Sequence, residues 1–357
     1  RPPEPRAGAP PGAGGLAAVI AAHNEAEVLG PALASLRAAV APPDFLMVIA
    51  DHCTDATADL ARQAGAEVWE RQEGAGSKGA ALRWLFARGA PALAAAAYVV
   101  VFDADTTVHP EFFVHLRLAL AGGADAAQAF VQPVNYANSP AATLAAYSEL
   151  LSQLADDRLR TRLGWPVPLR GTGMALRTEL FSRLQARLRT QTEDVELSLL
   201  LLEQGARVVF VPEAVLYDPK PPDAQRVARQ RARWLAGLAE VWRHYWPLVV
   251  RQLGRGPAAW SLLQAILLKP KTLFAAAKFL ALAAVLIFPV GLAWRAGAAL
   301  LLAGDLLYYG LGLGLVPAAD RRRFARALLL APLYGWVWGK SLVTAWRHRG
   351  GWLSVRR

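Results

Sequence analysis

Two aspartates follow an apolar run of the sequence at a spacing that suits a metal ion. Asp103 and Asp105 close the run YVVVFDAD (98–105), whose β-branched and aromatic residues are typical of a buried strand. Alternate residues of an extended chain share one face, so both carboxylates can address one hard cation. A cation held there can neutralise a diphosphate leaving group as a Lewis acid. The alternative is a pair of solvated aspartates in a turn.

A lysine lies where a helix is predicted to begin. Lys78 is part of the glycine-containing segment GAGSKGAALRW, and it is the only lysine among the first 200 residues. The backbone N–H groups and the dipole of a helix N-terminus favour a phosphate at such a position. This placement predicts a phosphate contact for Lys78, with an ordinary surface lysine as the alternative.

Two later motifs add an acid pair and a guanidinium–indole pair. Glu193 and Asp194 belong to T-E-D, which is also what an ordinary capped helix start contains. Arg233 and Trp234 end the motif Q-R-A-R-W (230–234). Arg233 is suited to grip a phosphate in bidentate fashion, and Trp234 is suited to stack on a sugar ring.

The elements that must position these side chains alternate between strand and helix. Asp51 closes a second apolar run, FLMVIAD, as Asp103 closes the run at 98–105. Such unbroken runs fit a parallel sheet covered on both faces, and therefore an α/β doubly wound architecture. Ligands of these sheets bind at the carboxyl ends of the strands. Strands are predicted at 16–23, 45–51, 66–70 and 98–105, and helices at 25–40, 54–65 and 77–88.

Charge divides the chain of 357 residues into two parts. Residues 1–224 hold 19 Lys and Arg against 25 Asp and Glu, a net charge of −6, whereas residues 225–357 hold 20 against 3, a net charge of +17. Nine of the 12 tryptophans also lie after residue 224. This distribution predicts a soluble head on a basic membrane base and argues against a nucleic-acid-binding protein. The 54% of hydrophobic residues excludes a disordered chain, and the single cysteine, Cys53, excludes an intrachain disulfide.

The second part of the chain carries several membrane signals. The basic, Trp-rich segment 225–247 predicts an amphipathic helix at a membrane interface, with a surface helix packed on the head as the alternative. Two apolar stretches, 272–293 and 297–316, each reach the roughly 20 residues that cross a bilayer. The stretch 327–345 contains Pro332 and Lys340, which favours an interfacial or re-entrant segment over a third span.

These signals give a domain plan and an orientation. Both basic segments, 321–326 and 346–357, are expected on the cytosolic side by the positive-inside rule. The catalytic domain then faces the cytoplasm of a multi-pass cell-membrane protein, as in a bacterial inner membrane. The plan is a linker at 1–15, a catalytic domain at 16–224, amphipathic interfacial helices at 225–270 and a membrane region at 271–357.

Seven motifs occur in a fixed order along the first 240 residues. They are A-H-N-E-A (22–26), D-H-C-T-D (51–55), G-S-K-G-A-A-L (76–82), D-A-D (103–105), G-T-G (171–173), T-E-D (192–194) and Q-R-A-R-W (230–234). In this order the chain resembles the family-two glycosyltransferases with a GT-A fold. More narrowly, it is similar to the membrane-embedded cellulose, chitin, hyaluronan and poly-N-acetylglucosamine synthases and to ceramide glucosyltransferase. The resemblance implies a GT-A domain with a mostly parallel, Rossmann-like sheet.

The resemblance also implies roles for individual residues. Asp194 would be the general base for the acceptor hydroxyl with Glu193 beside it, and Asp105 would bind Mg²⁺ or Mn²⁺ together with Asp103. Donor-binding positions would be Asn24, Glu25, Asp51, Lys78, Asp103 and Asp105. Positions for the acceptor or the diphosphate would be Gln230, Arg233, Trp234, Gly171 and Thr172.

The implied reaction is an inverting transfer of a hexose from a nucleotide sugar, with UDP as the expected nucleotide. The pattern departs from the family at His23 and at Asp51-His52-Cys53, both beside the implied nucleotide pocket. The expected partners are the donor, a lipid or glycan acceptor and a membrane with anionic lipids, and no nucleic acid; a homo-oligomer is left open. A processive, exporting polysaccharide synthase and a non-catalytic nucleotide-sugar-binding protein are the alternatives.

Overall fold

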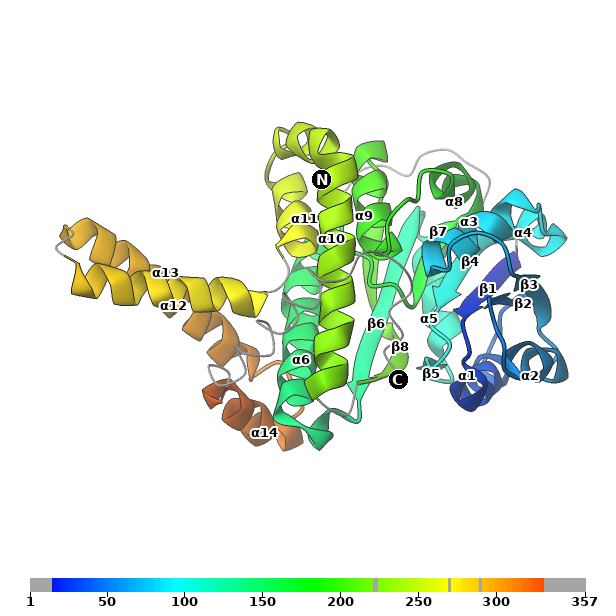
Figure 1. Ribbon diagram of the computed structural model, residues 1–357, viewed down its shortest axis with the longest axis horizontal. Coiled ribbons are helices and arrows are strands. Elements are labelled where there is room, and N and C mark those ends of the chain that lie inside the picture. Colours follow the sequence, from blue (N-terminus) through cyan, green and yellow to red (C-terminus); the bar gives the residue numbers. More distant parts are fainter. Residues whose placement is uncertain (1–14, 221–223, 269–270, 289–290, 331–357) are drawn as a thin grey trace.

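A mixed eight-stranded sheet forms the centre of the computed structural model, which describes residues 15–220, 224–268, 271–288 and 291–330 (Figure 1). The strand order is β3-β2-β1-β4-β7-β6-β8-β5. The strands are β1 (Gly15–Ala22), β2 (Phe45–Asp51), β3 (Glu67–Arg71), β4 (Ala96–Phe102), β5 (Thr107–Val108), β6 (Ala126–Val134), β7 (Met174–Arg177) and β8 (Val208–Pro219).

The sheet is less uniformly parallel than the sequence predicts. Strands β3, β2, β1 and β4 run parallel, as do β6 and β8, but β7 pairs antiparallel with both β4 and β6. The backbone N–H of Gly173 donates to the carbonyl of Val101 at 2.8 Å, so the chain enters β7 beside the carboxyl end of β4. From that edge β7 has to run against β4.

Helices cover both faces of the sheet. They are α1 (Ala26–Ala38), α2 (Thr57–Gln63), α3 (Lys78–Ala87), α4 (Pro91–Ala95), α5 (Phe112–Ala121), α6 (Pro140–Leu151), α7 (Arg158–Arg162), α8 (Thr178–Gln185), α9 (Glu193–Gln204), α10 (Ala224–Leu253), α11 (Pro257–Leu267), α12 (Lys271–Ile287), α13 (Leu292–Gly312) and α14 (Ala318–Leu329). A 3₁₀ turn (Tyr136–Asn138) precedes α6, and a π-helical turn, η2 (Ser152–Asp157), separates α6 from α7.

The apolar strands are buried on both sides, which explains their unbroken runs. Val19 and Val101 belong to the core that includes residues of α3, α8, α9, α10 and α11. Their neighbours Ile20 and Phe102 belong to the opposite core, with residues of α1 and α5. Because successive side chains of a strand point to opposite faces, every position of a doubly covered strand is apolar.

The C-terminal helices α12 and α13 form a hairpin that projects from the body (Figure 1). Lys278 and Asp305 join the two helices, with 2.7 Å between Nζ and Oδ1. These helices lie where spans 272–293 and 297–316 are predicted, but none of the helices in the described ranges is long and apolar enough to cross a membrane. The predicted transmembrane spans are therefore not supported: α12 has only 17 residues, and α13 carries Arg295 and Asp305.

Some predicted segments lie partly or wholly outside the described residues. Residues 1–14 of the predicted linker do so, and so do the tail and residues 331–345 of the predicted re-entrant stretch. The basic segment 321–326 is helical within α14. The predicted interfacial helix extends beyond residue 247, because α10 continues through Pro247 to Leu253.

Candidate active site

The ammonium of Lys78 is the meeting point of four motifs. Lys78 is the first residue of α3, which Ser77 caps by accepting from the N–H of Ala80. Its Nζ donates to Asp103 Oδ1 at 2.5 Å and to the carbonyl of Gly171 at 2.6 Å, and lies 3.9 Å from Glu193 Oε1. The predicted phosphate-binding lysine thus contacts D-A-D, G-T-G and T-E-D at once.

Opposite charges hold this lysine and its first partner ionised. Burial alone lowers the pKa of Lys78, but the charges of Asp103, Glu193 and Asp194 outweigh it and raise that pKa above its usual 10.5. Burial alone raises the pKa of Asp103, but Lys78, Arg233 and Lys220 bring it below 3.8. The charge of Arg233, in the Q-R-A-R-W motif, therefore acts on the D-A-D motif.

The loop of Gly171, Thr172 and Gly173 packs against the D-A-D motif. The hydroxyl of Thr172 accepts from the N–H of Asp103 at 3.2 Å and lies 3.0 Å from the hydroxyl of Thr106. Gly171 and Gly173 have φ values of +80° and +62°. A Cβ on Gly173 would lie 2.2 Å from a methyl of Leu216, so both conformation and space require glycine there.

The two acids of T-E-D differ in their surroundings. Glu193 is buried, and Asp194 beside it is half-buried in the first turn of α9. Burial raises the pKa of Glu193 to about 7; the charge of Lys78 opposes this rise, and those of Asp194 and Asp103 add to it. Glu193 is therefore a carboxyl group that exchanges its proton near neutral pH.

The raised pKa of Glu193 predicts a pH-dependent stability. Between pH 4.5 and about 7 the folded chain holds this proton and the unfolded chain does not, so stability falls as pH rises through this window. Glutamine does not ionise, so the Glu193→Gln variant does not lose this stability as the pH rises. Above pH 7 we expect the variant to melt at a higher temperature than the wild type. The difference corresponds to at most about 3 kcal/mol in the free energy of unfolding. Near pH 4 the difference should vanish.

Thermal unfolding of the ligand-free protein across this pH range checks the prediction. Glu179→Gln, which changes an exposed glutamate in the first turn of α8, is the control. A Glu193→Gln profile parallel to that of the wild type at every pH would contradict the assignment.

Helix α10 is fixed to the T-E-D loop through two glutamates that sequence reasoning missed, one of them buried and the other half-buried. Glu196 is fully buried and accepts from the N–H groups of Arg189 and Thr190 and from the hydroxyl of Tyr245 on α10. Glu240 of α10 accepts from the N–H of Gln191 at 2.9 Å. These contacts set the position of Q-R-A-R-W relative to T-E-D.

A close approach at Gly237 adds to this contact. A Cβ at Gly237 would lie 2.5 Å from Cγ2 of Thr192, which is short, β-branched and buried. We expect Gly237→Ala to lower the free energy of unfolding by about 1–3 kcal/mol, because α10 must move away from the T-E-D loop. Denaturant unfolding measures the effect.

Two further variants make that prediction specific. Thr192→Ser in the Gly237→Ala background removes the closest methyl and should restore part of the stability. Gly304→Ala on α13, where a Cβ meets nothing within 4 Å, should cost no stability. Equal effects of Gly237→Ala and Gly304→Ala would contradict the packing argument.

Asp51 lies in a second polar group at the end of β2. Its Oδ1 accepts from Arg71 Nη1 at 2.5 Å and lies 2.8 Å from His52 Nδ1. Its Oδ2 is buried and has no hydrogen-bond partner among the described residues. Arg71 was not predicted, because only the pairing of β2 with β3 brings it beside Asp51.

Asn24 and Glu25 shape the neighbouring loop. Asn24 has a φ of +54°, and its Oδ1 accepts from the N–H of Thr54 at 2.8 Å. The N–H of Glu25 donates to the hydroxyl of Thr57 at 2.9 Å. In this structure these contacts tie the loop after β1 to the loop after β2.

A half-buried charge cluster whose charges act on Asp218 together with Asp105 was also missed. The ammonium of Lys220 lies 2.5 Å from both Asp218 and Glu149. Burial raises the pKa of Asp218 to about 6; Lys220 opposes this rise, and the charges of Glu149 and Asp105 add to it. Asp105 and Asp218 therefore lie close enough to act on each other. An acid directly before Pro219, at the end of β8, was the signal in the sequence.

Gln230 and Trp234 lie on α10 in the same motif as Arg233. Trp234 is 46% exposed, and Gln230 is half-buried. Neither side chain makes a hydrogen bond with the described residues. Both side chains are therefore available for the predicted contacts with the acceptor or the diphosphate.

The acids of the site fit a metal only if a ligand completes its coordination. No group of three or more His, Cys, Asp or Glu side chains among the described residues is arranged to hold a metal ion by itself. Mg²⁺ is commonly held by one or two carboxylates together with substrate phosphates and water. Asp103 and Asp105, which follow the carboxyl end of β4, match such a donor set.

Comparison with known proteins settles the family. A family model described as "Glycosyltransferase like family 2" matches residues 11–237. The chain belongs to this family. The match of this glycosyltransferase family covers every motif from A-H-N-E-A to Q-R-A-R-W. A search of curated protein sequences gave no significant match.

A solved structure supports the fold of this family-two glycosyltransferase, and a second is similar over part of the chain. A mannosyltransferase from Pyrobaculum calidifontis in complex with GDP-Man and Mn²⁺ has a TM-score of 0.52 and 19% identity, covering 94% of this chain and 88% of that one. Glucosyl-3-phosphoglycerate synthase from Mycobacterium tuberculosis, with Mn²⁺, UDP and phosphoglyceric acid, has a TM-score of 0.45 and 22% identity, covering 64% and 78%. The first of these likenesses shows the α/β GT-A-like fold.

Proposed function

We propose that this chain is an inverting, metal-dependent glycosyltransferase that moves a hexose from a nucleotide sugar to a lipid or glycan acceptor at a membrane, forming a β-linkage. The observation that carries the proposal is the convergence on Lys78 of D-A-D, G-T-G and T-E-D. An inverting transfer needs one base and a stabilised leaving group, without an enzyme nucleophile. The membership of the glycosyltransferase family supports this reading.

Asp194 is the proposed general base. It is half-buried in the first turn of α9, beside Glu193, whose nearest cation is Lys78. The Asp194 carboxylate accepts the proton of the acceptor hydroxyl as the hydroxyl oxygen attacks the anomeric carbon and the bond to the diphosphate breaks.

Asp105, with Asp103, is the proposed holder of Mg²⁺ or Mn²⁺. When bound, the metal supplies positive charge that neutralises the departing diphosphate. Arg233 adds a guanidinium on the α10 side, near enough to lower the pKa of Asp103. Lys78 keeps Asp103 in its ionised form, which a metal ligand requires.

The nucleotide base is proposed to bind at Asp51. The buried Oδ2 has no partner among the described residues and is the proposed acceptor for an N–H of the base, whereas Arg71 and His52 both contact Oδ1. Uracil presents an N–H beside a carbonyl oxygen, which complements an acceptor next to donors, and UDP is the proposed nucleotide.

Calorimetric titration tests the donor site. We expect UDP to bind in the presence of Mn²⁺, more tightly than GDP, and binding to weaken strongly with EDTA. Asp51→Ala should reduce the preference for UDP over GDP. If neither nucleotide binds with Mn²⁺ present, the proposed function fails.

A membrane-bound position is part of the same proposal. Trp242 and Trp246 of α10 and Trp260 of α11 are exposed, together with Arg243 and Arg251. Basic, Trp-rich helices bind in the headgroup region of anionic membranes. We place this surface at the cytoplasmic face of a cell membrane, where the acceptor lipid or glycan is presented.

A further inference from the structure

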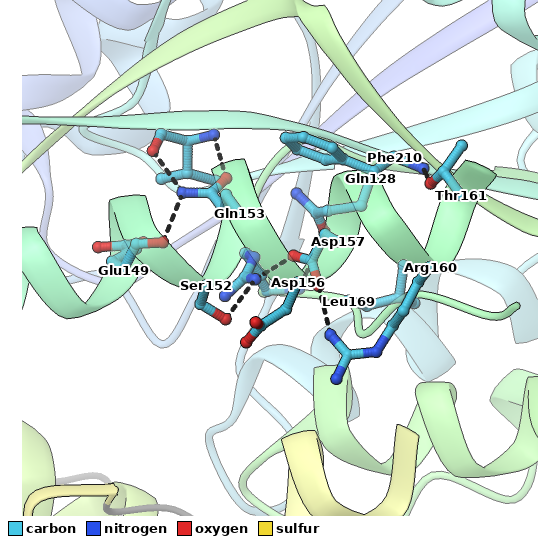
Figure 2. Close-up of polar contacts among 12 residues, drawn as sticks. Gln128, Glu149, Ser152, Gln153, Asp156, Asp157, Arg160, Thr161, Leu169 and Phe210 are labelled. Carbon is cyan, nitrogen blue, oxygen red and sulfur yellow. Dashed lines mark hydrogen bonds and ion pairs between the residues drawn. The ribbon is translucent and has the colours of Figure 1, made fainter. Parts of the chain in front are cut away.

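The π-helical turn η2 contains two consecutive aspartates, Asp156 and Asp157 (Figure 2), which contact two different parts of the chain. A π-helical turn is rare and occurs frequently at functional sites. Asp157 is in contact with the loop that precedes Gly171, and Asp156 is in contact with α13. Neither aspartate belongs to a motif of the proposed site.

Asp157 holds the loop through a buried ion pair. Its carboxylate is fully buried and accepts from Arg160 Nη1 at 2.9 Å and from Arg170 Nη2. Arg170 also donates to the hydroxyl of Ser152 at 3.2 Å. Removing one partner from such a pair leaves a buried charge without compensation, so the loop and the turn are held together.

Arg170 is the first residue of R-G-T-G (170–173), which contacts the proposed donor site. The N–H of Arg170 donates to Gln128 Oε1, and Gln128 Nε2 donates to the carbonyl of Thr172, both at 2.9 Å. The next carbonyl after Arg170, that of Gly171, accepts from Lys78. Through these bonds, a shift of η2 would move the Gly171 carbonyl and with it the ammonium of Lys78, which contacts Asp103 and Glu193.

Asp156 faces the opposite way, toward the C-terminal hairpin. The hydroxyl of Tyr308 on α13 donates to its carboxylate, at 3.0 and 3.1 Å from the two oxygens. Nearby, the hydroxyl of Tyr147 on α6 donates to the carbonyl of Tyr309. Helix α13 is therefore docked on α6 and η2 by specific hydrogen bonds.

We propose that η2 couples the docking of α13 to the position of R-G-T-G, so that the seating of the hairpin sets the affinity for the nucleotide donor. The coupling runs from Tyr308 through Asp156 and Asp157 to Arg170 and Lys78. Its consequence for the donor rests on the proposed function. Because coupling between two sites is reciprocal, nucleotide bound at Lys78 also stabilises the docked hairpin.

Tyr308→Phe, Asp156→Ala and the double variant test the coupling in the full chain. Tyr308→Phe deletes one hydroxyl and keeps the ring. Tyr309→Phe is the matched control, because it removes a neighbouring hydroxyl that makes no hydrogen bond with the described residues. Two readouts are measured: hydrogen exchange of the amides of residues 169–173 without nucleotide, and the affinity for UDP with Mn²⁺.

We expect each single variant to speed exchange at residues 169–173 and to weaken UDP binding, both by about 3- to 10-fold. The double variant should lose less than the sum of the two single losses, because both single variants remove the bond between Tyr308 and Asp156. Unchanged exchange in Tyr308→Phe, or an equal change in Tyr309→Phe, overturns the coupling. A wild type that binds no nucleotide refutes the proposed function, and the exchange measurement still decides the coupling.

Discussion

Asp194→Asn is expected to lower kcat by about 10²–10⁴-fold, the usual contribution of a general base, and to leave the affinity for UDP with Mn²⁺ within a few-fold of the wild type. Asparagine keeps the size of the side chain and its place in the first turn of α9. It cannot take the proton of the acceptor hydroxyl. Steady-state release of UDP from the nucleotide sugar measures kcat, and calorimetry measures binding.

A matched control separates catalysis from helix electrostatics. Glu179→Gln neutralises an acid in the first turn of another helix, α8, where the side chain is exposed. It should retain wild-type turnover. Turnover by Asp194→Asn close to that of the wild type would remove Asp194 from the role of base.

Asp105→Ala is expected to abolish the dependence of donor binding on the metal. The variant should bind UDP about 100-fold more weakly at saturating Mn²⁺, with affinity unchanged by EDTA. A metal supplies several kcal/mol of stabilisation to developing charge, and its loss corresponds to a factor of this size. Titration of UDP at several Mn²⁺ concentrations measures the effect.

The control for that variant removes a carboxylate far from the site. Asp59→Ala, on α2, changes an exposed aspartate that pairs with Arg62. Its titration should follow the wild type. A wild-type response to Mn²⁺ in Asp105→Ala would contradict the metal-binding role of the D-A-D motif.

The sequence was sufficient to locate the elements and the motifs that they carry. Continuous apolar runs predicted β1, β2 and β4, because strands covered on both faces have no polar side to reveal. The polar residues directly after these strands then had to meet at one edge of the sheet. Asp103, directly after β4, meets Lys78 and Glu193, which are the first residues of the helices α3 and α9.

Contacts that depend on tertiary packing could not be predicted. The 13-residue separation of Asp157 and Arg170 has no helical or strand period, and it becomes a contact only through η2 and the following loop. Gly237 is an unremarkable helix glycine until α10 lies against Thr192. The antiparallel β7 depends on where the chain enters the sheet, which local propensity does not encode.

In the membrane region, the sequence predicted features that the structure does not support. Apolar stretches predicted spans at residues 272–293 and 297–316, and the structure has helices at both. The prediction was based on the number of hydrophobic residues and took no account of where a helix ends. Helix α12 ends at Ile287, before the end of the predicted span at residue 293. The exposed apolar and tryptophan side chains of α10–α13 support membrane contact as a proposal independent of full spans.

The most direct test of the central claim is sugar transfer itself. Wild-type protein in membranes is supplied with UDP-hexoses, Mn²⁺ and extracted lipids, and nucleotide release and new glycosides are measured by mass spectrometry. We predict release of UDP with formation of one β-linked product, abolished by EDTA and by Asp194→Asn. Release no greater than that of Asp194→Asn, with every nucleotide sugar offered, would contradict the assignment of this chain as a glycosyltransferase of that mechanism.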